Sequence, residues 1–216
     1  MYDIDHSNSQ YLAVYIVLVN TALEHQTWHN KLSDMSVLRE ITQEKHQAVE
    51  HLPFIQYLLK GNIIQPHYVI YLAEMLAIYQ RLETLAQQAG LFDGLEQLPR
   101  AQHMQQDLDE LAPGYVTELS ASTQAYLVYL DRLFDSDRRD QLFAHVYVRH
   151  MGDLYGGKLI ARVVPGAGHW YEFENRAELA KKFNERITLD LADEALVAFD
   201  HYANIFQDLW NKIHTV

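Results

Sequence analysis

The chain has 216 residues, a length that suits one domain with a sizeable core, and it contains no cysteine. The lack of cysteine excludes disulfides, thiolate metal sites and cysteine nucleophiles. A formal net charge of −12 at pH 7 argues against nucleic-acid binding, which needs a basic surface opposite the phosphates.

The most apolar segment, Tyr11 to Leu23, is too short to span a bilayer, which takes about 20 residues. Asp3 and Asp5 precede it where a secretory signal would carry basic residues. We therefore expect a soluble, cytoplasmic protein without a membrane anchor.

Helical periodicity dominates the chain, and the strand-like alternation of apolar and polar residues is nearly absent. The prolines and most glycines fall between the periodic runs and punctuate them. The pattern predicts an all-α, multi-helix bundle. Its predicted helices are residues 10–24, 36–51, 53–60, 66–89, 100–111, 119–133, 137–162, 176–190 and 192–213.

Residues 1–34 are interpreted as an N-terminal extension of unknown role, and residues 35–216 as one helical domain. Asp34 and Ser36 offer a fresh helix N-cap at this boundary. The alternative, in which residues 10–24 are one more core helix, stays open.

Three glycines interrupt the predicted helix 137–162, although each costs about 1 kcal/mol relative to alanine. One stripe of that helix consists of glycines and polar residues: His145, Arg149, Gly152, Asp153 and Gly156. Such a stripe lets another group approach the backbone closely, and the Gly156-Gly157 pair allows a kink. Tight packing against a neighbouring helix is the alternative.

His46 lies in the predicted helix 36–51, at the edge of an apolar arc, with Arg39 and Glu50 projecting nearby. The residues of that arc are Leu38, Ile41, Ala48, Val49 and Leu52. A neutral imidazole in this position can ligate a metal while the glutamate accepts its other N–H. The chain has 12 histidines, so an ordinary solvated histidine is the alternative.

Together these two segments resemble the heme oxygenase family. LREITQEKHQAVE, Leu38 to Glu50, is similar to the proximal helix of the family. HVYVRHMGDLYGGK, starting at His145, is similar to its distal helix, with the pattern His-x-Tyr-x-Arg-x-x-Gly-Asp-Leu-x-Gly-Gly. The resemblance covers about Met35 to Leu209 in collinear order.

The resemblance implies roles for residues on both faces of a bound heme. His46 would be the iron ligand and Glu50 its hydrogen-bond acceptor. On the distal side it implies a catalytic set that orders water and delivers protons: Tyr79, Arg149, Gly152 and Asp153. Gly156 would also lie over the heme. An ion pair between Asp153 and Arg149 is the structural alternative.

The resemblance also implies cofactor-binding residues at the heme edge: Arg39, Tyr147, Lys182, Arg186 and Phe199. Lys182 and Arg186 are four positions apart and share one helical face. An ordinary solvated surface is the alternative for these two cations. Gln43 and Tyr155 depart from the pattern of the family, which leaves the cleaved meso carbon undetermined.

The implied function is oxygen-dependent cleavage of heme to biliverdin, carbon monoxide and ferrous iron. Heme would be both cofactor and substrate. The electrons would come from an external donor such as a ferredoxin or a reductase, because no Gly-x-Gly-x-x-Gly fingerprint is present. A noncatalytic heme carrier, or an interaction module, is the alternative. A di-iron carboxylate protein is excluded, because no histidine follows a glutamate by three positions.

Overall fold

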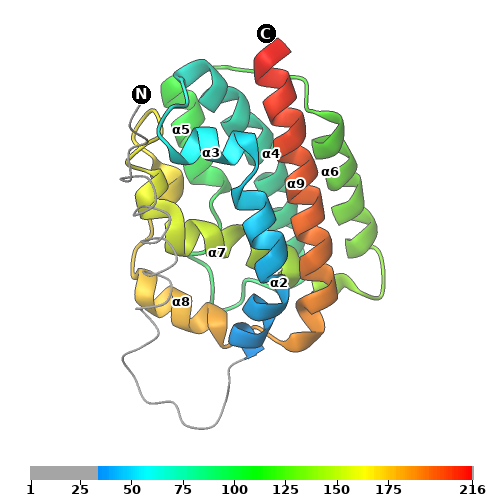
Figure 1. Cartoon of the computed structure of the whole chain (residues 1–216). Helices are drawn as coiled ribbons and strands as arrows, with labels where there is room; N and C mark the ends of the chain where they lie inside the picture. Colours follow the sequence, from blue (N-terminus) through cyan, green and yellow to red (C-terminus); the bar gives the residue numbers. More distant parts are fainter. Residues whose placement is uncertain (1–33, 216) are drawn as a thin grey trace, which may run out of the picture. The chain divides into compact units, whose positions relative to one another are not determined.

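The computed structural model describes residues 34–215; the predicted helix 10–24 and all of the predicted extension 1–34 except Asp34 lie outside this range. The described residues form eight α-helices and three short 3-10 segments, with no β-strand (Figure 1). The helices are α2 (Asp34–Glu50), α3 (Pro53–Leu59), α4 (Gln65–Gln88), α5 (Ala101–Leu111), α6 (Ala121–Phe134), α7 (Leu142–Ile160), α8 (Arg176–Asn184) and α9 (Ala192–Thr215). The predicted all-α class is confirmed.

Two predicted helices are wrong at one end. The predicted helix 176–190 stops at Asn184, and Thr188 is extended before the 3-10 segment η3 (Leu189–Leu191). The β-branched pair Ile187 and Thr188 disfavours a continued helix. The predicted helix 137–162 begins instead with the 3-10 segment η1 (Arg139–Gln141), and its α-helical part is α7.

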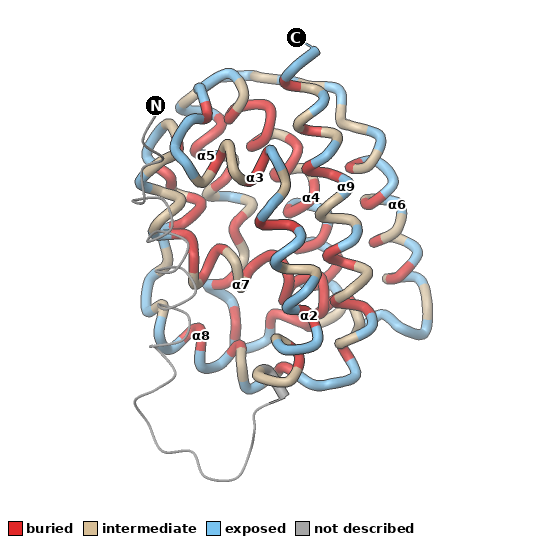
Figure 2. Tube along the Cα trace, in the orientation of Figure 1, coloured by how far each residue is buried: buried red, intermediate tan, exposed pale blue. Residues whose placement is uncertain are grey.

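Helix α4 lies at the centre of the bundle and packs against α5, α6, α7 and α9. Of its 24 residues 14 are buried, and after the first turn the exposed and half-buried ones lie on one narrow stripe that includes Ala73, Ala77, Gln80, Arg81 and Thr84. Pro66 lies in its first turn, where a missing N–H leaves no hydrogen bond unmade. Figure 2 shows buried positions gathered along α4 and α7. None of the helices in residues 34–215 is long and apolar enough to cross a membrane.

Helix α9 supports both helices that carry the predicted site, because α2 and α7 each pack along it. The buried residues of α2 are Leu38, Thr42, Val49 and Glu50. Ile41 is 43% exposed and Ala48 is exposed, so their prediction as buried residues is wrong. Apolar character alone did not show which side of α2 faces the bundle.

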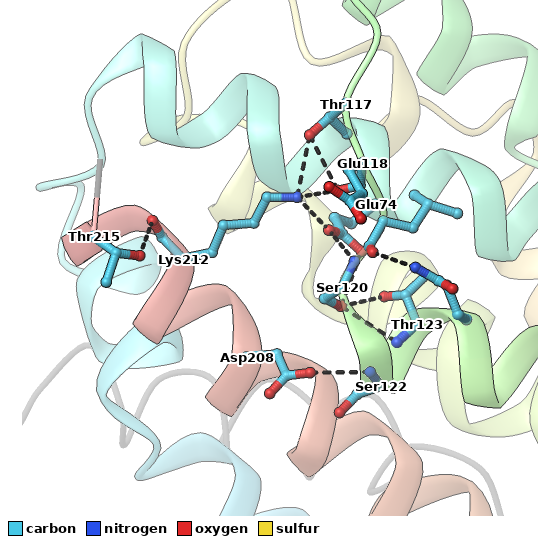
Figure 3. A network of polar contacts seen from close by, with 11 residues as sticks. Glu74, Thr117, Glu118, Ser120, Ser122, Thr123, Asp208, Lys212 and Thr215 are labelled. Atoms are coloured by element: carbon cyan, nitrogen blue, oxygen red, sulfur yellow. Dashed lines mark hydrogen bonds and ion pairs between the residues drawn. The ribbon is translucent and has the colours of Figure 1, made fainter.

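A buried carboxylate joins three helices on one side of the bundle (Figure 3). Glu74 of α4 accepts hydrogen bonds from the backbone N–H of Ser120, at 2.8 Å, and from Nζ of Lys212 on α9, also at 2.8 Å. Ser120 is the N-cap residue of α6, and Asp208 of α9 accepts from the N–H of Ser122 at 3.0 Å. The start of α6 is thereby fixed to α4 and α9.

Candidate active site

Asp153, near the middle of α7, is only 5% exposed and lies between side chains of two other elements. The hydroxyl of Tyr79 on α4 donates to its Oδ2 at 2.6 Å, and the indole N–H of Trp170 donates to the same oxygen at 3.0 Å. Burial raises the pKa of Asp153, whereas His150 and these two hydrogen bonds oppose that shift. The predicted residues Tyr79 and Asp153 therefore touch directly.

Trp170 is a site neighbour that sequence reasoning missed. It lies in the 3-10 segment η2 (His169–Tyr171), after Gly168, whose positive φ of 74° favours glycine. The backbone N–H groups of His169 and Trp170 donate to the two oxygens of Asp107 on α5, both at 2.8 Å. A tryptophan in a glycine-rich loop was the available signal, but nothing in the sequence pairs it with Asp153.

Arg149 is buried one turn before Asp153, yet among the described residues no ion pair joins the two. Its guanidinium lies over the rings of Tyr126, at 5.0 Å, and Tyr202, at 4.5 Å. Nη1 contacts the sulfur of Met75 at 3.6 Å, while Nε and Nη2 are buried without a hydrogen-bond partner. A buried cation with unused donors normally has water or a ligand beside it.

The glycines of α7 have different surroundings. A Cβ placed on Gly152 would meet no atom within 4 Å outside its own helix, so the space beside it is open. A Cβ on Gly157 would lie 2.9 Å from Cδ1 and 3.1 Å from Cβ of Tyr171. Gly156 is buried beside it. Close packing thus explains Gly157, whereas Gly152 leaves room for another group.

His46 on α2 has a side chain that is 45% exposed, and its Nδ1 lies 3.6 Å from Oε1 of Glu50. This distance is longer than a hydrogen bond but places the carboxylate beside the ring. The ring meets that of Phe199 on α9 edge to face, with 5.9 Å between centroids. Partial burial lowers the pKa of His46, with Arg39 acting the same way and Glu50 opposing it. The neutral imidazole is therefore favoured.

Arg39 of α2 acts on the pKa of two tyrosines of α7, Tyr147 and Tyr155. Burial raises the pKa of Tyr147 on α7, and the nearby Thr42 and Arg39 of α2 oppose the shift. Tyr155, also on α7, accepts a hydrogen bond from Nδ2 of Asn184 at 3.1 Å, and Arg39 acts on its pKa as well. Two of the predicted edge residues, Arg39 and Tyr147, therefore interact electrostatically from different helices.

The other two predicted cations, Lys182 and Arg186, already have partners within the protein. Lys182 is 51% exposed at its side chain and pairs with Glu178, one turn earlier, at 3.1 Å. Arg186 donates to the backbone carbonyls of Leu91, at 2.7 Å, and Asp93, at 3.1 Å. None of these contacts involves Arg39. Arg186 instead links the end of α8 to the loop after α4.

His145, at the start of the glycine stripe, belongs to a buried chain of hydrogen bonds. Its Nδ1 lies 2.8 Å from the hydroxyl of Tyr126, and its Nε2 lies 3.0 Å from Glu194. Burial lowers the pKa of His145. Burial opposes ionisation of Glu194, but hydrogen bonds from His145 and Tyr129 and the charge of Arg138 outweigh it and lower its pKa to about 2. This chain fixes α7 to α6 and α9.

Among residues 34–215, one group of acidic and histidine side chains has ligand atoms within 4.8 Å of one another: Asp107, Glu110 and His169. Both oxygens of Asp107 already accept backbone N–H groups, and His169 bonds Glu110 at 3.0 Å. These contacts fasten η2 to α5. We therefore interpret Asp107, Glu110 and His169 as residues that join η2 to α5, and not as a metal site.

The family model described as "Heme oxygenase" matches residues 33–208. Rat heme oxygenase 2 is 28% identical over 88% of this chain and 70% of its own length. Heme oxygenase 1 of a Nostoc strain is 28% identical over 80% of this chain and 84% of its own length.

Solved structures share the fold at lower identity. Heme oxygenase-1 of the cyanobacterium Synechocystis, in complex with heme, superimposes with a TM-score of 0.74 at 22% identity, over 85% of this chain and 95% of that one. The heme oxygenase of Leptospira interrogans gives 0.71 at 24% identity, over 81% and 98%. Likeness at this identity concerns the arrangement of the helices.

Proposed function

The chain belongs to the heme oxygenase family, and on that premise we propose that His46 is its iron ligand and Asp153 the residue that orders water on the opposite face. It is a heme-degrading oxidoreductase, with heme as cofactor and substrate and molecular oxygen as co-substrate. Bound heme supplies the iron that activates oxygen and the ring that is opened to biliverdin, carbon monoxide and ferrous iron.

Three features of the described residues fit a flat group that carries a metal. Gly152 has open space where a side chain would stand. Arg149, on the same helix, has buried donors without partners. His46 presents a partly exposed imidazole whose lowered pKa favours the neutral form that binds metals. Helices α2 and α7 both pack along α9, so a group between them would be supported from that side.

On the proximal side we assign the work to two neighbours of His46. Glu50, whose Oε1 lies 3.6 Å from Nδ1, would accept the N–H of Nδ1 when the ring binds iron, which would fix the tautomer and leave Nε2 as the ligand atom. Phe199 contacts the imidazole ring with its own ring and limits the rotation of that side chain. Their task is to orient the ligand.

On the distal side, Asp153 acts by holding water in place, with Tyr79 as its direct hydrogen-bond partner. A carboxylate that orders water transfers protons more gradually than a strong acid in direct contact. Gly152 and Gly156 keep side chains away from the reacting face, and Arg149 donates to the same water. The bond between Tyr79 and Asp153, beside the open face of Gly152, is the observation that carries this proposal.

At the heme edge we assign propionate binding first to Arg39 and Tyr147, because the charge of Arg39 already acts on the Tyr147 hydroxyl. Lys182 and Arg186 would bind there only after leaving Glu178 and the backbone carbonyls that they now contact. They are therefore the weaker members of the predicted set.

We further propose that electrons come from a separate donor such as a ferredoxin or a reductase, and that the protein acts in the cytoplasm. The catalytic unit is the helical domain from residue 35 onward, since the family match begins at residue 33.

Titration with hemin tests the proximal assignment. The wild type should form one stoichiometric complex with a Soret band, and His46→Ala should lose the nitrogen ligand, seen as a changed Soret and charge-transfer spectrum. His51→Ala is the matched control, because His51 is an exposed histidine at the end of the same helix. An identical spectrum for His46→Ala and the wild type would remove the assignment.

Turnover with ascorbate or a reductase system tests the distal assignment. The wild-type complex should convert heme to a bilin, and Asp153→Ala should lower the rate by 10²-fold or more, in the range that a positioned proton-transfer group contributes. Asp137→Ala, at an exposed aspartate, is the control. Heme binding by the wild type without ring opening would instead favour the noncatalytic carrier.

A further inference from the structure

We propose that Trp170 is a positioning residue for the distal carboxylate: its indole N–H and the Tyr79 hydroxyl together hold Oδ2 of Asp153, which leaves Oδ1 to bind the water that serves the heme face. This inference deepens the proposed function and rests on it, because it assigns the orientation of Asp153 to a residue outside the distal motif.

Both donors reach the same oxygen from different elements. Tyr79 comes from α4 at 2.6 Å and Trp170 from η2 at 3.0 Å, while Asp153 itself lies on α7. None of the described hydrogen bonds reaches Oδ1. An ionised carboxylate has about four acceptor positions, so two donors on Oδ2 fix the rotation of the group and leave acceptor positions on Oδ1 for water.

The indole is itself held firmly. Trp170 is 2% exposed, and its ring stacks on Tyr171 at 4.7 Å and meets Tyr79 edge to face at 5.4 Å. Its backbone N–H is bonded to Asp107. A donor fixed by packing and by a backbone bond keeps its direction, which is the property required of a group that orients a catalytic side chain.

The hydrogen bonds that orient the Asp153 carboxylate come from neutral donors, because no charged side chain bonds its oxygens among the described residues. Arg149 points to tyrosine rings, and Arg176 of α8 donates to the backbone carbonyl of Asp153. His150 on the same helix and Arg100 at the start of α5 favour the ionised form from further away. Burial disfavours that form, so the removal of one neutral donor should make the carboxyl a weaker acid and free it to rotate.

The first test measures the carboxyl directly in the full-length, heme-free protein. With the aspartate side-chain carboxyls labelled with ¹³C, the Asp153 resonance is assigned by its loss in Asp153→Asn. In Trp170→Phe, which keeps an aromatic ring and loses the N–H, the titration midpoint should rise by about one pH unit or more. Trp210→Phe, on α9, should not move it. An unmoved midpoint in Trp170→Phe overturns the proposal.

A measurement on the wild type covers the case in which Trp170→Phe does not fold. The indole proton of Trp170 should titrate with the same midpoint as the Asp153 carboxyl, and that step should vanish in Asp153→Asn. The indole proton of Trp210 should show no such step. If the chemical shift of the Trp170 indole proton does not change when Asp153 is protonated, the hydrogen bond between Trp170 and Asp153 is refuted.

The second test measures turnover of the hemin complex. Trp170→Phe should lower the rate several-fold at unchanged hemin affinity, and the pH at which the rate changes should move with the carboxyl midpoint. A wild-type rate and pH profile in Trp170→Phe overturns the positioning role. If Asp153→Asn turns over normally, the distal assignment of the proposed function fails instead, whatever the NMR titration shows.

Discussion

Gly152 and Gly157 of α7 allow a paired prediction, because the same substitution meets opposite surroundings at the two positions. Gly152→Ala and Gly157→Ala each replace a helical glycine by alanine, which by itself stabilises a helix by about 1 kcal/mol. That contribution cancels when the two variants are compared. The difference in their unfolding free energies therefore reports packing alone.

At Gly152 the new methyl group would meet nothing within 4 Å outside its own helix, so the heme-free protein should gain about 1 kcal/mol. At Gly157 the methyl would lie 2.9 Å from Cδ1 and 3.1 Å from Cβ of Tyr171. Tyr171 cannot easily retreat, because it is buried and stacked on Trp170 at 4.7 Å. Overpacking of this kind costs about 1–3 kcal/mol, so the net change should lie between about 0 and −2 kcal/mol.

Urea unfolding of the heme-free variants, followed by far-ultraviolet circular dichroism, measures both values. Gly152→Ala should be the more stable by about 1–3 kcal/mol, or several degrees in Tm for a chain of this size. Equal stabilities would refute the conclusion that close packing explains one glycine and open space the other. A destabilised Gly152→Ala would show that the space beside that residue is filled.

Three further predictions use the same fold. Gly152→Ala, though stabilised without heme, should bind hemin more weakly or turn it over more slowly, as measured by hemin titration and bilin formation, because its methyl occupies the open space. Glu74→Ala should lower the unfolding free energy by about 1–3 kcal/mol, because buried partners lose their acceptor, whereas Asp131→Ala, which breaks an exposed pair with Arg81, should cost under about 1 kcal/mol. The pKa of Glu194 is lowered to about 2, so its contribution to stability is complete above about pH 5 and is lost as the pH falls toward 2. Denaturant unfolding across this pH range should show that the unfolding free energy of Glu194→Gln declines less steeply with falling pH than that of the wild type. Parallel curves would contradict the lowered pKa of Glu194.

Most of the fold was predictable, because proline and glycine punctuate the helices locally. Pro53 and Pro66 lie in the first turns of α3 and α4, where the sequence places helix starts. The error at the end of α8 reflects a local signal, the β-branched pair Ile187 and Thr188, whereas the error at Ile41 arose where a long-range contact decides the outcome. The side of α2 that α9 covers determines the exposure of Ile41, and the sequence of α2 does not contain that information.

The candidate site likewise contains residues that a local motif predicts and partners that only the folded structure shows. The sequence identified Asp153 and Gly152 because both belong to one contiguous motif. It missed Trp170, which follows Asp153 by 17 positions in a loop whose path depends on Asp107 of α5. It also gave no sign that Arg186 would bond the carbonyls after α4. Such partners depend on loop conformation, which residue spacing does not encode.

The separation of Arg149 from Asp153 bears on the proposed role of the carboxylate in holding water. Residues four apart on a helix are neighbours, so an ion pair between Arg149 and Asp153 was the structural alternative. Here the guanidinium is held over Tyr126 and Tyr202, while the carboxylate is held by Tyr79 and a neutral indole. A bidentate ion pair would join one edge of the guanidinium to both carboxylate oxygens and would fix the two groups against each other. With aromatic rings and neutral donors as partners instead, Oδ1 of Asp153 and Nε and Nη2 of Arg149 have no hydrogen-bond partner among the described residues, as the proposed water-ordering role requires.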